Sequence, residues 1–293
     1  MIDKKIIAGK NIYIFESHEM SFAAWGEIKK TLKTDLILLS FDHHTDTHEA
    51  FLKHYYEKYN IESSLEYDED RHNQFVEELL SKIDIDNQTS IYDAAHLLHN
   101  DEQIDAAIKK GFVSYAFIIT HDSMGTPSLE ESKWRDENLS GTNFIRTQIE
   151  GEKTPYPKRP FTYAAPATRI FEIDEFEGGQ DDETEKEHYD KAIESTYLNS
   201  KITVINEMAA SIGITTLLET KFILDIDLDY FKTSKSISPD STEMFYKIVR
   251  AAAAITIAKE TVFVESVKYP GEEINSESLL NAVIDHIGRA LAV

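Results

Sequence analysis

The sequence predicts an α/β fold with three layers, in which helices cover both faces of a mainly parallel sheet. Apolar runs of strand length alternate with longer segments whose apolar residues recur at the spacing of a helix. Several of these runs are too rich in Ile, Val, Leu and Phe to leave one strand face in water, which is typical of parallel strands covered on both sides. Right-handed crossovers then place the carboxyl ends of the parallel strands at one edge of the sheet.

The predicted elements follow one another at short intervals. We expect strands at 11–15, 35–41, 113–120, 221–226 and 261–264. We expect helices at 20–32, 50–59, 73–82, 102–110, 185–212, 241–258 and 276–291. Gly111 directly follows the fourth of these helices, at a position where glycine commonly ends a helix.

The segment 122–165 interrupts this alternation. It contains several glycines and prolines and shows no sustained periodicity. Long loops of this kind often cover active sites. We therefore expect one catalytic domain that spans residues 1–293, with a loop-rich insertion around 122–165.

Composition excludes several classes of protein. The net charge is -23, with 53 acidic residues against 30 basic ones, so the surface repels nucleic acid and anionic lipid and attracts cations. No apolar run approaches the roughly 20 residues of a membrane-spanning helix, and the first residues lack a secretory signal. Without cysteine the chain forms no disulfides and no thiolate metal sites. We expect a cytoplasmic protein that binds neither nucleic acid nor membranes; the sequence indicates no oligomeric state.

Three polar residues alternate directly after the second predicted strand: Asp42, His44 and Asp46. Because successive strand side chains point to opposite faces, these three share one side. Two carboxylates and an imidazole around one point are costly unless a cation neutralises them. His43 points to the opposite face under the same alternation, so we expect it to contact the ligands and support them without binding the metal itself.

Other polar residues follow the remaining predicted strands. Asp225 and Asp227 follow the fourth strand, and we expect the nearby Asp229 to play a supporting part. Ligands of open α/β sheets bind outside the carboxyl ends of the strands. Polar groups at five strand ends are better explained by one shared site than by chance at each end. The site then also includes the residues at the remaining three ends: His18, His121 and Glu265.

The candidate ligands indicate the kind of metal centre. Two imidazoles and four carboxylates are too many for one ion and suit two divalent ions about 3.5–4 Å apart that share carboxylates. Oxygen-rich, thiolate-free coordination favours two Mn²⁺, or another hard divalent metal. The predicted reaction is metal-assisted hydrolysis at carbon or phosphorus, and the expected ligands are His18, Asp42, His44, Asp46, Asp225 and Asp227.

These motifs resemble those of the arginase and ureohydrolase superfamily. The segment 42–46 is similar to the central metal motif, and 224–227 is similar to the second Asp-x-Asp motif. Glu265, after an apolar run, resembles the late glutamate that binds guanidinium. The resemblance implies an arginase/deacetylase-like fold.

A closer resemblance concerns the arginase-like family that contains the peptide arginases. The runs 12–19, 41–48 and 224–231 are similar to motifs of that family, whose members convert arginine to ornithine within ribosomally made peptides and release urea. The resemblance implies that the six ligands hold two Mn²⁺ and that Glu265 pairs with the guanidinium. His121 is the candidate proton shuttle, on its position.

The chain departs from the enzymes that act on free arginine. Its first metal motif reads Glu-Ser-His-Glu where those enzymes have Gly-Gly-Asp-His, and the segment after Asp46 lacks the Asn and Ser pattern that binds an α-carboxylate. The expected partner is therefore an arginine-containing peptide or protein as substrate.

Two alternatives remain open. A metal-dependent deacetylase on the same fold uses a single Zn²⁺, so the number of ions separates it from the arginase type. A non-catalytic metal-binding module would keep the ligands without turnover. Phosphoesterases with an Asp-His-His signature fit less well, because their Asp-x-Asp motif precedes that signature and here it follows.

Overall fold

The computed structural model describes residues 2–121, 123–139, 155–173 and 182–292. Within these ranges the strands form one sheet in the order β1-β2-β7-β6-β3-β4-β5. Each neighbouring pair is parallel except β1 and β2, which are antiparallel. The strands are β1 (Asp3–Ile7), β2 (Lys10–Phe15), β3 (Ile37–Asp42), β4 (Tyr115–Thr120), β5 (Ile170–Ile173), β6 (Phe222–Asp227) and β7 (Ala254–Ala258).

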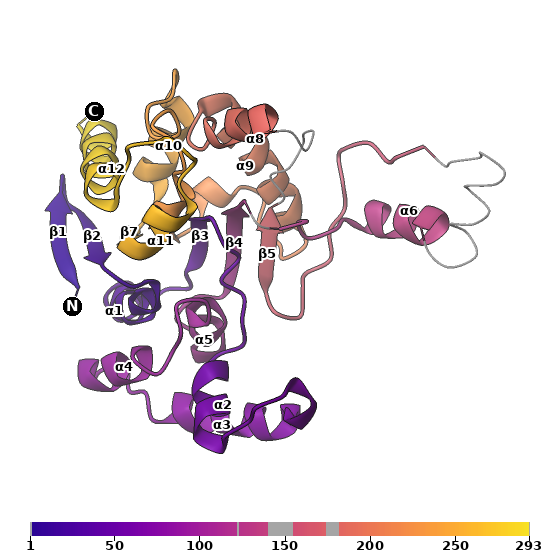
Figure 1. Ribbon diagram of the computed structural model, residues 1–293, viewed down its shortest axis with the longest axis vertical. Coiled ribbons are helices and arrows are strands. Elements are labelled where there is room, and N and C mark those ends of the chain that lie inside the picture. Colours follow the sequence, from indigo (N-terminus) through magenta and orange to yellow (C-terminus); the bar gives the residue numbers. More distant parts are fainter. Residues whose placement is uncertain (1, 122, 140–154, 174–181, 293) are drawn as a thin grey trace.

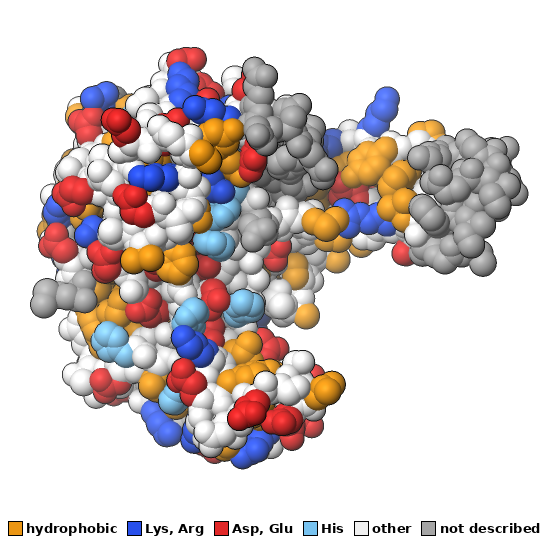
Figure 2. All heavy atoms as spheres, viewed as in Figure 1, with side chains coloured by type: hydrophobic (Ala, Val, Ile, Leu, Met, Phe, Trp, Pro, Cys, Tyr) orange, Lys and Arg blue, Asp and Glu red, His pale blue; other side chains and the backbone are white. Residues whose placement is uncertain are grey.

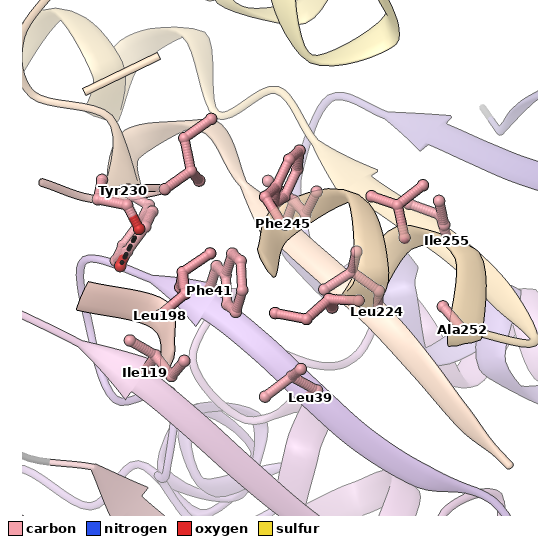
Figure 3. Packing of buried hydrophobic residues seen from close by; sticks show 14 of the residues in the cluster. Leu39, Phe41, Ile119, Leu198, Leu224, Tyr230, Phe245, Ala252 and Ile255 are labelled. Atoms are coloured by element: carbon pink, nitrogen blue, oxygen red, sulfur yellow. Dashed lines mark hydrogen bonds between the residues drawn. The ribbon is translucent and has the colours of Figure 1, made fainter. Parts of the chain in front are cut away.

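Helices cover both faces of the sheet, as a three-layer α/β arrangement requires (Figure 1). One core packs beneath α9 (Ser195–Ala210), α10 (Glu243–Ala251) and α12 (Ser276–Leu291). Figure 3 shows part of it, with Leu39 and Phe41 of β3 beside Leu224 of β6 and Phe245 of α10. The other core packs against α1 (Ser21–Leu32), α2 (Leu52–Tyr59), α3 (Glu69–Ser81), α4 (Gln88–Ala95) and α5 (Gln103–Lys110).

Two parts of the chain project beyond the sheet and its covering helices. The segment that carries α6 (Leu129–Leu139) extends away as an arm, and α2 and α3 form a lobe with η2 (Ser64–Glu66) (Figure 1). Between lobe and arm the surface is hollowed, and histidine side chains gather there (Figure 2). The remaining elements are η1 (His18–Met20), α8 (Asp182–Tyr189), η3 (Leu217–Glu219), η4 (Leu228–Tyr230) and α11 (Thr261–Val267).

The structure confirms four predicted strands and corrects the fifth. The segment 261–264 is helical and belongs to α11, while the strand lies at Ala254–Ala258, inside the helix predicted at 241–258. Alanine favours helix locally, but Ile255, Thr256 and Ile257 are completely buried between β2 and β6. Burial on both faces outweighs the local preference for helix.

Other predictions hold in part. The segment 185–212, expected as one helix, forms two helices, α8 and α9. The edge strands β1 and β5 were not predicted. The described part of 122–165 contains α6 and is not wholly a loop. Residues 122 and 140–154 of that insertion lie outside the described residues.

Among the helices that the structure describes, none combines the length and the apolar character needed to cross a membrane.

Candidate metal centre

The candidate site lies at the carboxyl ends of four neighbouring strands, β2, β7, β6 and β3. Ser40 of β3 pairs with Asp225 of β6, which in turn pairs with Thr256 of β7. Because strand side chains alternate, Asp42 lies on the same face as Ser40, and Asp227 lies on the same face as Asp225. The register therefore gathers these polar groups on the side of the sheet that α1 and α5 cover.

Four buried side chains converge on one point, and we call them the inner group: His18, Asp42, Asp46 and Asp227. The Nδ1 atom of His18 lies 3.3 Å from Asp42 Oδ2, 2.8 Å from Asp46 Oδ2 and 3.1 Å from Asp227 Oδ2. No hydrogen bond forms at His18 Nδ1 or Asp42 Oδ2 within the described part of the chain, despite these short distances. Neighbouring ligand atoms around one octahedral ion at about 2.1 Å are about 3 Å apart, so the donor set fits a divalent cation.

Asp225 lies behind His18. Its Oδ2 atom is 2.8 Å from His18 Nε2 and accepts a hydrogen bond from Ser40 Oγ at 2.9 Å. Its Oδ1 atom accepts a hydrogen bond from Thr256 Oγ1 at 2.5 Å. Both carboxylate oxygens are thus engaged by side chains, in the manner of a carboxylate that orients a metal-binding histidine. The geometry gives Asp225, predicted as a ligand, a supporting position instead.

A second set of ligand atoms, the outer group, comes from Asp42, His44 and Asp229. His44 Nδ1 lies 3.2 Å from Asp229 Oδ2, and the backbone N–H of His44 donates to Asp42 Oδ1 at 2.8 Å. Asp229, expected in a supporting part, therefore lies among the candidate ligands. Asp42 belongs to both groups.

The loop after β3 is held in place by residues of other elements. Thr120 Oγ1 donates to the carbonyl oxygens of His43 and His44, at 2.8 and 2.9 Å. The buried Gln103 of α5 donates from Nε2 to Asp46 Oδ2 at 2.5 Å, where the backbone of Asp46 is left-handed with φ 48°. A single glutamine at the start of a helix has no motif, so sequence reasoning had no signal by which to find Gln103.

The inner group carries an excess of buried negative charge. Burial raises the pKa of Asp42 well above its usual value, and the charges of Asp46 and Asp227 add to this. Burial and the charge of Asp229 raise the pKa of Asp227 in the same way. For His18, burial acts to lower the pKa, but Asp225 and the other carboxylates raise it well above its usual value. A bound cation would relieve this repulsion between buried carboxylates.

Asp229 responds differently from the carboxylates of the inner group. Burial acts to raise its pKa, but the hydrogen bond from His44 and the charges of His44 and His43 lower it overall. Asp229 is therefore favoured in its ionised form beside His44, as a metal ligand must be.

Glu260, which the sequence reasoning missed, follows the end of β7. Its Oε1 atom accepts a hydrogen bond from the backbone N–H of His18 at 2.6 Å. Burial raises the pKa of this carboxyl to about 7. The predicted residue, Glu265, is exposed on α11, where its Oε2 atom lies 2.6 Å from Lys268 Nζ. Because the strand ends at Ala258, Glu260 takes the place expected for Glu265.

His121 and His43 lie beside the outer group. His121 follows β4; its ring stacks on Tyr230 with centroids 4.7 Å apart, and its Nε2 atom is 3.1 Å from the Tyr230 carbonyl oxygen. The ring of His43 lies 4.4 Å from that of His44 and 6.1 Å from that of His121. Burial and the charge of Lys232 lower the pKa of His43 to about 3, so its imidazole is neutral. The roles expected for both histidines remain predictions.

A cavity of about 720 Å³ lies between the arm and α9, away from these residues. Its lining includes Arg135, Tyr156 and Lys201, and it contains none of the candidate metal ligands. The orphaned ligand atoms, and not this cavity, therefore identify the candidate functional site.

No protein-family model matches the chain, and no curated protein matches its sequence.

Proposed function

We propose that this protein is a metal-dependent hydrolase of the arginase type, which acts on the guanidinium of arginine within a peptide or protein. The main support is the inner group, in which His18 Nδ1 lies within 3.3 Å of three carboxylate oxygens yet has no hydrogen bond within the described residues. A buried donor set of this kind is costly without a cation. The resemblance of the strand-end motifs to the arginase-like family supplies the reaction.

Each group of ligands would hold one divalent ion, with Mn²⁺ the expected metal, and Asp42 would touch both. Ions bound there would lower the pKa of water and supply Lewis-acid catalysis. Asp225 fixes the ring of His18 through Nε2, so that Nδ1 faces the carboxylates. Gln103 fixes Asp46 in the same way.

Glu260 is the best-placed carboxylate for the guanidinium. A carboxylate accepts two parallel N–H bonds from a planar guanidinium. Its Oε1 atom already accepts from the His18 backbone, which holds the carboxyl next to the inner group. The cationic substrate would also favour the ionised form of Glu260, whose pKa burial raises to about 7.

The overall reaction consumes one water for each arginine. Water adds to the guanidinium carbon, and the bond from that carbon to Nε of arginine breaks. The nitrogen leaves with a proton as the amine of ornithine, and the rest departs as urea. His121 is our candidate for the group that moves this proton, and this role rests on its position after β4.

The direct test supplies arginine-containing peptides to Mn²⁺-loaded protein. We expect urea to appear and the peptide mass to fall by the mass of urea less that of water. Glu260→Gln should lower kcat/KM by about 100-fold or more with metal still bound, because the neutral amide loses the charge-assisted pair. Glu265→Gln, the matched control on the next helix, should change it less than twofold. Metal-loaded protein that releases no urea from any arginine peptide would exclude this function.

The number of bound ions separates the alternatives. Two ions per chain support the arginase type, since the inner and outer groups would then both be filled. One zinc ion together with cleavage of acetyl-lysine would favour the deacetylase. Two bound ions without turnover of either substrate would favour a binding module.

A further inference from the structure

Two neighbouring apolar side chains of α11 are exposed, and one of them lies beside the outer group. Val262 is 77 % exposed and Phe263 is 36 % exposed. The ring of Phe263 meets that of His44 edge-on, with centroids 6.1 Å apart. We call Val262 and Phe263 the apolar lip. Because it touches a candidate metal ligand, it borders the space that a substrate of this site must occupy.

The helix that carries the lip is anchored at its start and on its buried side. α11 begins directly after Glu260, and its Val264 is buried in the core. The carboxylate of Glu16 accepts from the backbone N–H of Thr261 at 3.2 Å and pairs with Lys259 Nζ at 2.9 Å. The backbone that carries the two side chains is thus anchored before any substrate arrives, which lowers the entropic cost of using them for binding.

The lip and Glu260 are close along the chain. Glu260 directly precedes α11 in a left-handed conformation, and Phe263 is the third residue of that helix. If Glu260 pairs with the guanidinium, the parts of the substrate that reach the lip are those nearest the reacting side chain. The lip itself is uncharged, although the protein as a whole has a net charge of -23. It suits an apolar neighbour better than a second cation.

We propose that the apolar lip contacts the side chain next to the reacting arginine and thereby selects peptides with an apolar residue at that position. This inference rests on the proposed function and extends it from the reacting group to its neighbour. Partial burial of one leucine side chain against the lip is worth about a tenfold gain in kcat/KM.

The experiment compares two blocked peptides, Leu-Arg-Leu and Gly-Arg-Gly, as substrates of the Mn²⁺-loaded protein. The wild type should prefer the leucine peptide by about tenfold in kcat/KM. Phe263→Ala should reduce this ratio towards one, and Val262→Ser should reduce it by a smaller factor. The control is Ile6→Ala, which should leave both rates unchanged. Ile6 is 72 % exposed on β1 and pairs with Asn11 near the amino end of β2, away from the carboxyl ends that carry the site.

The outcomes separate this inference from the proposed function. Equal rates on the two peptides, or a Phe263→Ala protein that keeps the wild-type ratio, would overturn the inference while urea release upholds the function. The function fails only if no arginine peptide, these two included, releases urea, and the dissociation constants of the two peptides then test the lip. Equal dissociation constants for wild type and Phe263→Ala would overturn it as well.

Discussion

The inner and outer groups of the candidate metal centre use the same types of side chain but differ in the burial of their histidine. The ligand candidates of the inner group are at most 5 % exposed, and Asp225 and Gln103 fix two of them. In the outer group the side chain of His44 is 40 % exposed. Electrostatic attraction is stronger away from water, and fixed ligands lose less entropy when they bind. We therefore expect the inner ion to be held tightly and the outer ion to exchange and to meet the substrate.

The largest expected effect comes from the residue that the two groups share. Asp42→Ala removes a ligand from both, so both ions should be lost and activity should fall by at least about 1,000-fold. Metal analysis of the dialysed protein checks this, with Asp35→Ala as the control because the side chain of Asp35 is 95 % exposed. A variant that kept either ion at full occupancy would show that Asp42 does not bridge.

The two histidines give the sharpest contrast between the groups. His44→Ala should leave one ion bound and lower kcat by about 100-fold, since the inner ligands are untouched. The His18→Ala variant should not bind the inner ion, and the carboxylates around that site should then no longer be held in fixed positions. Calorimetric titration with Mn²⁺ counts the ions in each case. Equal losses in the two variants would contradict the difference in affinity.

Asp225→Asn tests whether this residue supports the inner ion or binds it. An amide can still contact His18 Nε2, but it orients the ring less strongly than a carboxylate does. Loss of such a supporting carboxylate typically costs about 10–100-fold in metal affinity. We expect the Mn²⁺ dissociation constant of the inner site to rise by that factor, with the outer ion retained. Complete loss of the inner ion would make Asp225 a ligand after all.

The smallest effect concerns the stability of the metal-free protein. The folded pKa of Glu260 is raised to about 7, so between about pH 4.5 and 7 the folded state keeps a proton that the unfolded state releases. Stability therefore falls as pH rises through this window. The raised pKa of His18 acts in the same direction, because its stabilising charge is lost as pH rises.

Urea unfolding in the presence of a chelator measures this loss. We expect the free energy of unfolding to fall by on the order of 2 kcal/mol between pH 4.5 and 7.5, and Mn²⁺ to abolish most of the fall. Glu260→Gln should flatten the profile of the metal-free protein. Stability that rises with pH in the chelated wild type would mean that burial does not raise the pKa of Glu260.

The order of neighbouring residues in the sequence predicted most of the polar side chains that lie at this edge of the sheet. The alternation Asp42-x-His44-x-Asp46 after a buried strand needs only neighbouring residues to be read, and the structure brings all three into the candidate centre. His18 and Asp227 follow or end apolar runs in the same way. The strand prediction was wrong at β7, where local propensity and burial disagree. As a result Glu265 was expected at the end of a strand, and it lies on α11 instead.

By itself the sequence determined which chemical groups stand at the strand ends and how acidic the chain is, because both follow from local order and composition. Only the tertiary structure decided which carboxylate is placed to bind an ion and which supports a ligand. Asp225 and Asp229 are equally acidic in the sequence, but Ser40 of β3 and Thr256 of β7 engage both oxygens of Asp225, while Asp229 meets His44. Hydrogen bonds between strands far apart in the chain set that difference, and no local pattern records them.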